Sequence, residues 1–314
     1  MRTFLILLSA LSLSWLTASA HYFPDIRDPG AKYPIDTCRL CVTYDFAYVE
    51  DTSDMKILHD RTLLEIGPST SRYYSQYTDR IDSMAYLHYL EIPRTDIARL
   101  EKGIQVWNWL QPDEHPWYCD VYTFPKEKKR MVSTRFLEEE YRYDEPVEAL
   151  DWRITEQTDT VAGYLCRKAV ATFRGRTWEA WFAPEIPQAH GPWKLGGLPG
   201  LILKAADTEG LFRWTAIGLE QPVGRMIHDY ADKALNGTNR HELIIPSHKK
   251  IKCSRKDVDR LWRRQWLAPL TVMFLDGEEH IIYDMSTQKT VEIDINYICL
   301  LYTSDAADDR ISVD

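Results

Sequence analysis

The sequence predicts a β-rich α+β fold, with a curved antiparallel sheet (a meander, an open barrel or a sandwich-like arrangement) and two or more packing helices. Three observations lead to this fold class. Apolar and polar residues alternate in several runs, which is the pattern of strands with one buried face. Turn residues separate these runs at hairpin spacing. The chain of 314 residues also contains 11 Trp and 18 Tyr, and aromatic residues are enriched in strands.

In the N-terminal half, the sequence predicts one clear strand and one helix. Val42, Tyr44, Phe46 and Tyr48 alternate with small or polar residues, which predicts a strand. After a Gly-Pro-Ser turn, apolar positions three or four residues apart predict a helix that packs on the sheet. These positions are Tyr73, Tyr77, Ile81, Met84 and His88. Weaker strand patterns lie at residues 104–110, 117–124 and 130–136.

The part of the chain after Asp151 has the clearest antiparallel pattern. The predicted strands are residues 151–158, 164–173, 177–182, 201–206 and 211–219. Short segments of turn residues separate them, so a meander followed by a further hairpin is expected. Ser254 is the expected cap of a later helix. The face of that helix would present Val258, Leu261, Trp262 and Trp266.

Both ends of the chain differ in kind from the rest. Residues 1–20 are typical of a cleavable signal peptide, which predicts an exported protein of the periplasm, cell envelope or extracellular space. An uncleaved membrane anchor is the weaker alternative, because serines interrupt the apolar stretch. The codons inferred for residues 299–304 resemble a sequencing-library adapter, so residues 299–314 are interpreted as read-through, with an ordinary polar tail as the alternative. Residues 21–298 are then expected to form a single domain.

The charge of the chain argues against a nucleic-acid partner. It contains 38 Lys and Arg against 47 Asp and Glu, a formal net charge of −9, whereas nucleic-acid binding requires a clustered basic face. The basic run at residues 126–130 is interpreted as a solvated turn. No transmembrane segment is predicted in the mature chain, and the expected partner is an unknown envelope protein or extracellular ligand.

Five cysteines before the C-terminal segment are expected to form structural disulfides. They are Cys38, Cys41, Cys119, Cys166 and Cys253. Disulfides are the default in an exported chain, although an odd number leaves one thiol unpaired unless its partner lies beyond the end of the sequence. Cys38 and Cys41 have the spacing of a redox motif but precede a strand and do not open a helix. No metal and no cofactor are expected, since no further paired Cys or His follows.

One segment of the chain carries a specific resemblance to a known family. Residues 191–202 spell GPWKLGGLPGLI, and segments 161–166, 173–176, 178–182 and 185–187 precede them in the expected order. The motif residues are Gly191, Pro192, Trp193, Gly197, Leu198, Pro199, Gly200, Leu201 and Ile202. This segment resembles the GLPGLI family of Bacteroidota, and the resemblance extends over most of residues 42–220. It implies export, a bacterial host of that phylum and a β-rich fold, but no biochemical activity.

The glycines and prolines of the motif predict a shaped loop that leads into a buried strand. Glycine permits positive φ and proline fixes its own φ, so the backbone of such a loop is well defined. In the favoured structural interpretation, Trp193 and Leu198 close one end of the sheet. In the functional alternative, the loop allows a ligand or a partner backbone to approach closely. A phosphate-binding loop is not expected, because Leu201, Ile202 and a strand follow the last glycine.

The candidate ligand or partner surface consists of charged and aromatic residues around this loop. They are Arg174, Arg176, Trp178, Trp181, Trp193 and Lys194. Arginines beside tryptophans can stack a sugar or hold a carboxylate in a bidentate fork. In the favoured alternative, Arg174 and Arg176 form ion pairs with Glu179 or Asp207 on neighbouring strands.

The sequence contains no recognisable catalytic motif. Neither a Gly-x-Ser-x-Gly elbow nor a His-Glu-x-x-His pair is present. The acidic clusters at residues 138–140 and 144–145 are interpreted as surface charge, because neighbouring residues on a strand point in opposite directions. We therefore expect a non-catalytic binding or scaffolding module of the bacterial envelope. The alternatives are a hydrolase acting on envelope or extracellular glycans or peptides, and a purely structural partner of an outer-membrane assembly.

Overall fold

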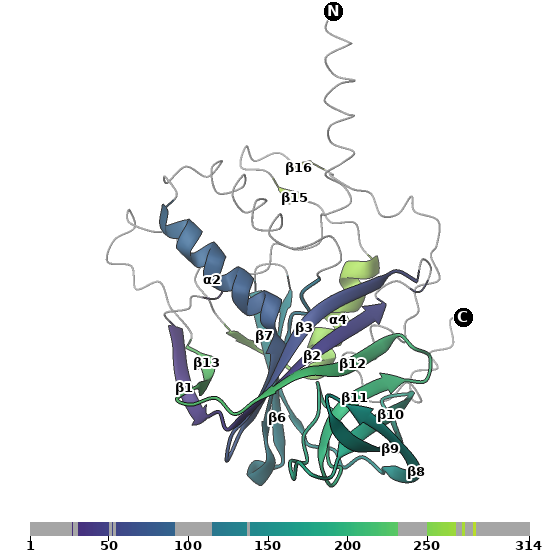
Figure 1. Ribbon diagram of the computed structural model, residues 1–314. Helices are drawn as coiled ribbons and strands as arrows, with labels where there is room; N and C mark the ends of the chain where they lie inside the picture. Colours follow the sequence, from purple (N-terminus) through teal and green to yellow (C-terminus); the bar gives the residue numbers. More distant parts are fainter. Residues whose placement is uncertain are drawn as a thin grey trace, which may run out of the picture.

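The computed structural model is mostly β, with one large sheet and two helices in its described part (Figure 1). The structure describes residues 27, 31–49, 52, 55–91, 115–136, 139–231, 250–267, 272–273 and 279–280. The first elements are β1 (Lys32–Thr37), β2 (Leu40–Val49), β3 (Ile57–Ile66), β4 (Ser71–Ser75), α2 (Gln76–Glu91), β5 (Cys119–Phe124), η3 (Pro125–Glu127), β6 (Lys129–Phe136) and β7 (Glu139–Pro146). They are followed by β8 (Arg153–Val161), β9 (Tyr164–Phe173), β10 (Arg176–Ala183), β11 (Leu201–Asp207), β12 (Phe212–Glu220), β13 (Met226–Tyr230), β14 (Lys250–Lys252), α4 (Arg255–Leu267), β15 (Val272–Met273) and β16 (Glu279–His280).

The large sheet contains 12 of the described strands in the order β14-β7-β6-β5-β4-β3-β2-β12-β11-β10-β9-β8. Its neighbouring strands are antiparallel, except that β14 runs parallel to β7. The order has two ends, so the described sheet is open. The predicted β-rich class with helices is therefore confirmed. The predicted signal peptide (1–20), the weak strand at 104–110 and the C-terminal segment (299–314) lie outside the described residues.

Tight turns connect the strands of the predicted meander. Ala162 and Gly163, between β8 and β9, have φ of 49° and 85°. Arg174 and Gly175, between β9 and β10, have φ of 51° and 75°. Positive φ at both central residues is typical of the type I′ turn, whose twist matches that of the paired strands. These turns set the register of β9 with β10 and that of β8 with β9 next to the turn; further along β8, the register shifts between Ile154 and Thr158.

The helix predicted from Tyr73 onward begins three residues later. Tyr73 lies in β4, because residues 71–75 pair with β3 and three of them also pair with β5. The hydroxyl of Ser75 accepts a hydrogen bond from the Thr78 backbone N–H (3.1 Å) and so caps α2. Tyr77 and Ile81, one turn apart on α2, are buried. Apolar spacing alone did not distinguish the end of a strand from the start of a helix, and strand pairing decided it.

The predicted cap of the second helix is confirmed. The Ser254 hydroxyl accepts a hydrogen bond from the Asp257 backbone N–H (3.2 Å). The Asp257 carboxylate in turn accepts one from the Ser254 backbone N–H (2.9 Å). This reciprocal pair is a capping box, which satisfies two backbone donors at the start of α4. Val258 is buried against the main core, while the side chains of Trp262 and Trp266 lie outside the described residues.

An aromatic core covers one face of the sheet. The ring of Trp214 stacks on Phe46 at 4.5 Å and lies 5.8 Å from Trp178. Its indole N–H donates a hydrogen bond to the Tyr73 hydroxyl (2.8 Å), although β12 and β4 are separated by two strands in the sheet. A large aromatic side chain buries roughly 150–250 Å², which stabilises the fold by at most about 4–6 kcal/mol.

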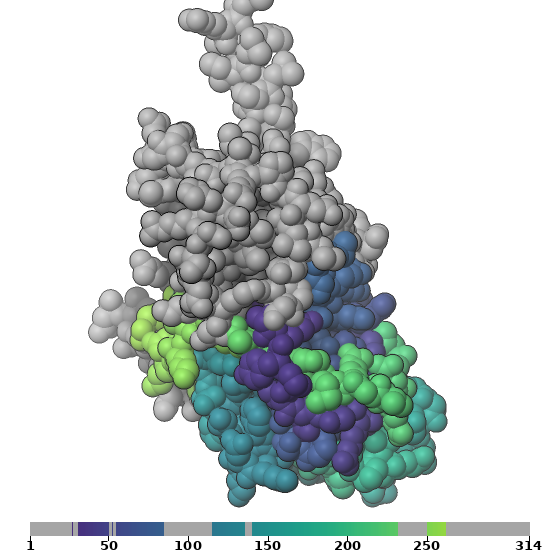
Figure 2. All heavy atoms as spheres, turned by 90° about the vertical axis from the view of Figure 1, so that its left-hand side faces the viewer, coloured from purple at the N-terminus to yellow at the C-terminus, as the bar shows by residue number. Residues whose placement is uncertain are grey.

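Strands β1 and β13 pair to form a separate two-stranded ribbon (Figure 1). The ribbon packs on β5 and β7, on the face of the large sheet opposite the aromatic core. Tyr122 of β5 donates a hydrogen bond to the backbone carbonyl of His228 (3.2 Å), and Arg142 of β7 pairs with Asp229 (2.7 Å). Figure 2 shows purple and green segments in contact at the surface on this side of the molecule. Neither helix in the described part of the chain is long and apolar enough to cross a membrane.

Candidate functional site

The GLPGLI loop, residues 191–200, is a packed loop between β10 and β11. The Leu195 backbone N–H donates a hydrogen bond to the Pro192 carbonyl (3.0 Å), which closes a turn. The Ile202 N–H bonds to the His190 carbonyl (3.0 Å) and ties the end of the loop to its beginning. The segment is therefore an ordered loop that leads directly into a buried strand, as the glycine and proline pattern predicts.

Trp193 and Leu198 point into the core from this loop. Trp193 is 5% exposed and Leu198 1% exposed. The Trp193 ring lies 5.9 Å from Phe173 and 5.9 Å from Trp178. Both loop residues belong to the main core cluster, so the structural interpretation, in which they close one end of the sheet, agrees with their position.

Charged residues from three distant parts of the chain meet beside the loop. The Lys194 ammonium lies 2.8 Å from the Glu145 carboxylate, and Arg174 pairs with the other oxygen of Glu145 at 3.0 Å. Arg174 also lies 3.5 Å from the partly exposed Glu148. Arg130 donates a hydrogen bond to the Lys194 backbone carbonyl (2.6 Å). We call Arg130, Glu145, Arg174 and Lys194 the loop cluster, and all four are buried.

The loop cluster shifts the proton affinities of its members. Burial raises the pKa of Glu145, but Lys194 and Arg174 outweigh it and lower that pKa to about 2. Burial, with Arg174 beside it, lowers the pKa of Lys194 to about 8 in spite of Glu145. Burial also lowers the pKa of Arg130 to about 10. Burial and Arg130 together lower the pKa of His190 to about 4, so this imidazole is neutral at pH 7.

Two other predicted site residues are also buried in the fold. Arg176 pairs with Asp207 at 2.7 Å, which is one of the two cross-strand pairings considered from the sequence. Glu179 instead pairs with Lys168 at 2.8 Å. Trp178 is 1% exposed and donates its indole N–H to the Phe173 carbonyl (3.1 Å). Arg176 and Trp178 thus stabilise the packing of β10 through a buried ion pair and a buried hydrogen bond, and neither is available to a ligand at the surface.

Trp181 is the one predicted site residue that is partly exposed, and it lies on the face of β10 opposite Trp178. It pairs in register with Lys168 on β9 and Lys204 on β11. Both ammonium groups lie 5.7 Å from the centroid of its ring, within the range of a cation–π contact. Thr215 on β12 continues the line. We call Lys168, Trp181, Lys204 and Thr215 the Trp181 row, and all four side chains are partly exposed.

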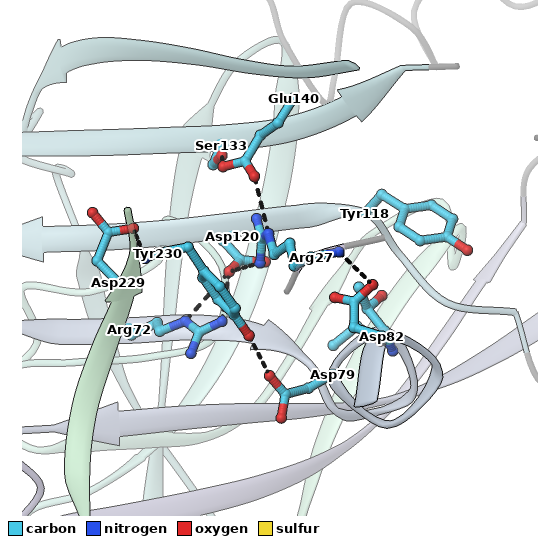
Figure 3. Close-up of polar contacts among 12 residues, drawn as sticks. Arg27, Arg72, Asp79, Asp82, Tyr118, Asp120, Ser133, Glu140, Asp229 and Tyr230 are labelled. Carbon is cyan, nitrogen blue, oxygen red and sulfur yellow. Dashed lines mark hydrogen bonds and ion pairs between the residues drawn. The ribbon is translucent and has the colours of Figure 1, made fainter. Parts of the chain in front are cut away.

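A second buried group of charges lies under the β1–β13 ribbon and α2 (Figure 3). Arg27 pairs with Asp120 at 2.8 Å and with Glu140 at 3.0 Å. Arg72 pairs with the same oxygen of Asp120 at 2.7 Å. The Arg27 guanidinium also lies 4.7 Å from the centroid of the Tyr230 ring. Figure 3 shows these side chains pointing toward one another from β4, β5, β7 and the ribbon.

The interpretation of the acidic clusters as surface charge is wrong for two of their members. Glu140 and Glu145 are 0% and 6% exposed. They point to opposite faces of β7, because Glu140 pairs with Arg27 under the ribbon and Glu145 belongs to the loop cluster. The two carboxylates therefore do not form a catalytic pair. Paired arginines and a lysine allow them to be buried as ions.

The expectation of disulfides is wrong for the described residues. The five cysteines there are free. Cys41, Cys119 and Cys166 lie on β2, β5 and β9, and no two of these strands are neighbours in the sheet. Cys38 and Cys41 lie in one small apolar cluster, where burial raises the pKa of the two thiols to about 11 and about 12. They pack as small apolar side chains, and their thiols stay protonated at neutral pH.

Arg174 and Lys194 of the loop cluster were predicted from the sequence, whereas Arg130 and Glu145 were not. Both lie in segments interpreted as solvated charge. The one sequence signal for Arg130 is its position at the start of the strand pattern of residues 130–136, and no strand was predicted around Glu145. In the described part of the chain, no three His, Cys, Asp or Glu side chains converge as metal ligands would.

One family model, of unknown function, matches a short part of the chain. Residues 174–204 match a family model described as "Protein of unknown function (Porph_ging)". This segment runs from the first arginine of the candidate surface through the GLPGLI loop into β11, and the match agrees with the resemblance that the motif carries. No curated protein matches the chain.

Two solved structures of PNGF-II resemble the chain weakly. The structure in space group P21 has 13% sequence identity and a TM-score of 0.45, and the aligned region covers 76% of this chain and 35% of the PNGF-II chain. The structure in space group C2 has 15% identity and a TM-score of 0.43, and covers 76% and 36%. The chain thus spans about a third of the length of these proteins.

Proposed function

We propose that this protein is an exported, non-catalytic binding module of the bacterial cell envelope, and that it binds a saccharide on the Trp181 row. The observation that carries the proposal is the position of Trp181, a partly exposed indole flanked by two lysines at 5.7 Å from its ring centroid. A sugar ring can stack on such an indole while its hydroxyl groups bond to the charged side chains beside it.

Charged partners beside the row supply both donors and acceptors. Lys168 pairs with Glu179 at 2.8 Å, and Lys204 lies 3.5 Å from Asp159. Lysine donates hydrogen bonds and carboxylates accept them, so sugar hydroxyls could bond to either group. Every one of these four side chains keeps some exposure. The row therefore offers the combination of a flat apolar surface and polar groups that saccharide binding requires.

We further infer that the sheet is curved, with the aromatic core on its inner face and the Trp181 row on its outer face. Contacts that skip strands support this curvature: Tyr44 of β2 donates a hydrogen bond to the Ile202 carbonyl of β11 (2.6 Å), although β12 lies between them. A curved sheet filled by its own side chains leaves the outer face for a partner.

Binding without catalysis is favoured by the state of the reactive groups in the described part of the chain. Burial raises the pKa of the Cys119 thiol to about 12 and that of the Cys253 thiol to about 11, so neither supplies a thiolate at neutral pH. The buried carboxylates Glu140 and Glu145 are paired with cations on opposite faces of β7. A hydrolase would need a free acid and base within one cleft.

The test is binding of the full chain to polysaccharide and peptidoglycan fractions of its host envelope, measured by co-sedimentation. Trp181→Ala removes the stacking surface, and Thr177→Ala, on the outer face of the same strand, is the matched control. We expect Trp181→Ala to weaken binding at least tenfold while Thr177→Ala binds like the unchanged protein. Equal binding by both variants, or no binding by the unchanged protein, would refute the proposal.

A further inference from the structure

We propose that the loop cluster is a binding site for a small monoanion of the carboxylate class, held between the guanidinium groups of Arg130 and Arg174. The site lies on the inner side of the molecule beside Trp193 and Lys194, whereas the Trp181 row lies on the outer face. It is a second site, independent of the proposed saccharide surface.

The loop cluster carries more positive than negative charge. Arg130, Arg174 and Lys194 bring three cations together, and Glu145 is the one carboxylate that the described structure buries among them. Glu148 lies 3.5 Å from Arg174, but its side chain is 41% exposed. Even when Glu148 is counted, one positive charge remains uncompensated in a buried setting. A buried charge is stable only when a counter-charge and hydrogen bonds accompany it.

Both arginines of the loop cluster have buried N–H donors without an acceptor among the described residues. The Nε and Nη1 atoms of Arg130 are buried, and none of the described residues accepts a hydrogen bond from them. The same is true of Nε and Nη1 of Arg174. A buried donor that is left unpaired destabilises the fold, and a guanidinium does not lose its proton to avoid that cost. Four buried donors on two neighbouring cations thus point to an acceptor that carries negative charge.

The shape and charge of a carboxylate match these donors. A carboxylate has two oxygens in one plane and carries a single charge, which equals the positive charge that remains when both Glu145 and Glu148 are counted. Arginine forks recognise such planar groups by two parallel hydrogen bonds. A phosphate or sulfate carrying two charges would exceed the positive charge available, since Lys194 is already paired with Glu145 at 2.8 Å. The geometry therefore favours a carboxylate, free or as part of a larger ligand.

The electrostatic effect of Arg174 on Arg130 agrees with an anion bound between them. The pKa of Arg130 is lowered to about 10, chiefly by burial; Glu145 opposes the shift and the neighbouring Arg174 adds to it. An anion between the two guanidiniums would remove this repulsion and restore the proton affinity of Arg130.

The experiment measures anion-dependent thermal unfolding of the full chain in acetate, chloride and sulfate at equal ionic strength. Arg130→Gln removes one side of the site without unpairing Glu145. Arg176→Gln is the matched control, because Arg176 is also a buried arginine but pairs with Asp207 away from the cluster. We expect acetate to raise the midpoint of the unchanged protein and of Arg176→Gln in a saturable manner, and to leave that of Arg130→Gln unaffected.

A second measurement reports on the site without relying on stability. The Lys194 ammonium lies 5.6 Å from the centroid of the Trp193 ring, so the indole N–H resonance of Trp193, assigned with Trp193→Phe, is expected to shift on titration with acetate. No shift, a response that follows ionic strength alone, or an equal acetate response in Arg130→Gln would overturn the proposal. A stronger effect of sulfate than of acetate would overturn the carboxylate assignment. None of these results depends on binding at the Trp181 row.

Discussion

Substitution of individual glycines in the GLPGLI loop tests whether its backbone is built as the structure shows. Gly200 has φ of 152°, and a Cβ added there would lie 2.3 Å from the carbonyl oxygen of Ala183. Gly197 has φ of 86°, and a Cβ added there would meet nothing within 4 Å. The two residues are three positions apart in one loop, so alanine at each separates steric overlap from backbone strain alone.

The magnitudes follow from these two environments. Alanine at Gly197 only has to adopt a left-handed conformation, which costs about 1–2 kcal/mol. Alanine at Gly200 requires a backbone region that is nearly exclusive to glycine, at about 1–3 kcal/mol, and also overlaps a backbone atom, at about 1–3 kcal/mol. Ala183 cannot move away easily, because it pairs with Leu201 at the end of β10. We expect a loss of about 4 kcal/mol for Gly200→Ala.

Equilibrium unfolding in urea provides the assay. Because slopes of about 1–3 kcal/mol per molar are usual, Gly200→Ala is expected to lower the urea midpoint by more than 1 M or so, and Gly197→Ala by clearly less. Gly200→Ala within about 1 kcal/mol of the unchanged protein, or a larger loss for Gly197→Ala, would show that the loop does not pack against Ala183 in this way.

Three further predictions concern the buried ions, the helix cap and the thiols. The pKa of Glu145 is lowered from 4.5 to about 2, so its ionised carboxylate contributes stability above pH 4.5 that is lost as pH falls through 2. Glu145→Gln should therefore lose about 3–5 kcal/mol of unfolding free energy at pH 7 and much less at pH 2.5. A difference in unfolding free energy between the two proteins that does not change with pH, measured by urea titration, would contradict this. Ser254→Ala should cost about 1 kcal/mol and speed hydrogen exchange in the first turn of α4; unchanged exchange would argue against the capping box. Cys38 and Cys41, with pKa values raised to about 11 and about 12, should resist iodoacetamide at pH 8 until denaturant is added, and reductant should leave the unfolding midpoint unchanged; a lowered midpoint would indicate a disulfide.

The sequence predicted the β-rich class and much of the second half of the sheet, because local signals there are strong. The strand predicted at residues 164–173 has the bounds of β9, and the turn residues around Gly163 and Gly175 have the positive φ that type I′ hairpins require. The boundary between β4 and α2 could not be predicted from the sequence, because Tyr73 fits the apolar spacing of a helix equally well. Pairing with β3 and β5 placed it in a strand, and such long-range pairing leaves no local pattern.

The loop cluster could be predicted only in part, for a related reason. Arg174 and Lys194 stand near a recognisable motif, but Arg130 and Glu145 come from β6 and β7, far away in the sequence. A charged residue in a strand pattern is usually solvated, and only the folded sheet shows that these two face the loop. The same reasoning explains the error over Glu140, whose partner Arg27 lies 113 residues away.

The GLPGLI loop connects the aromatic core to the loop cluster through two adjacent residues. Trp193 has φ of 52°, a conformation that a tryptophan adopts only at a cost of about 1–2 kcal/mol. This conformation lets the Trp193 ring pack at 5.9 Å from Trp178 while the next side chain, Lys194, reaches Glu145 at 2.8 Å. An ordinary extended backbone would also separate the two side chains, but it would not close the turn from Pro192 to Leu195 that returns the chain to β11. The strain at Trp193 is therefore offset by core packing on one side and by a buried ion pair on the other. Occupation of the proposed anion site should stabilise the loop and the core together.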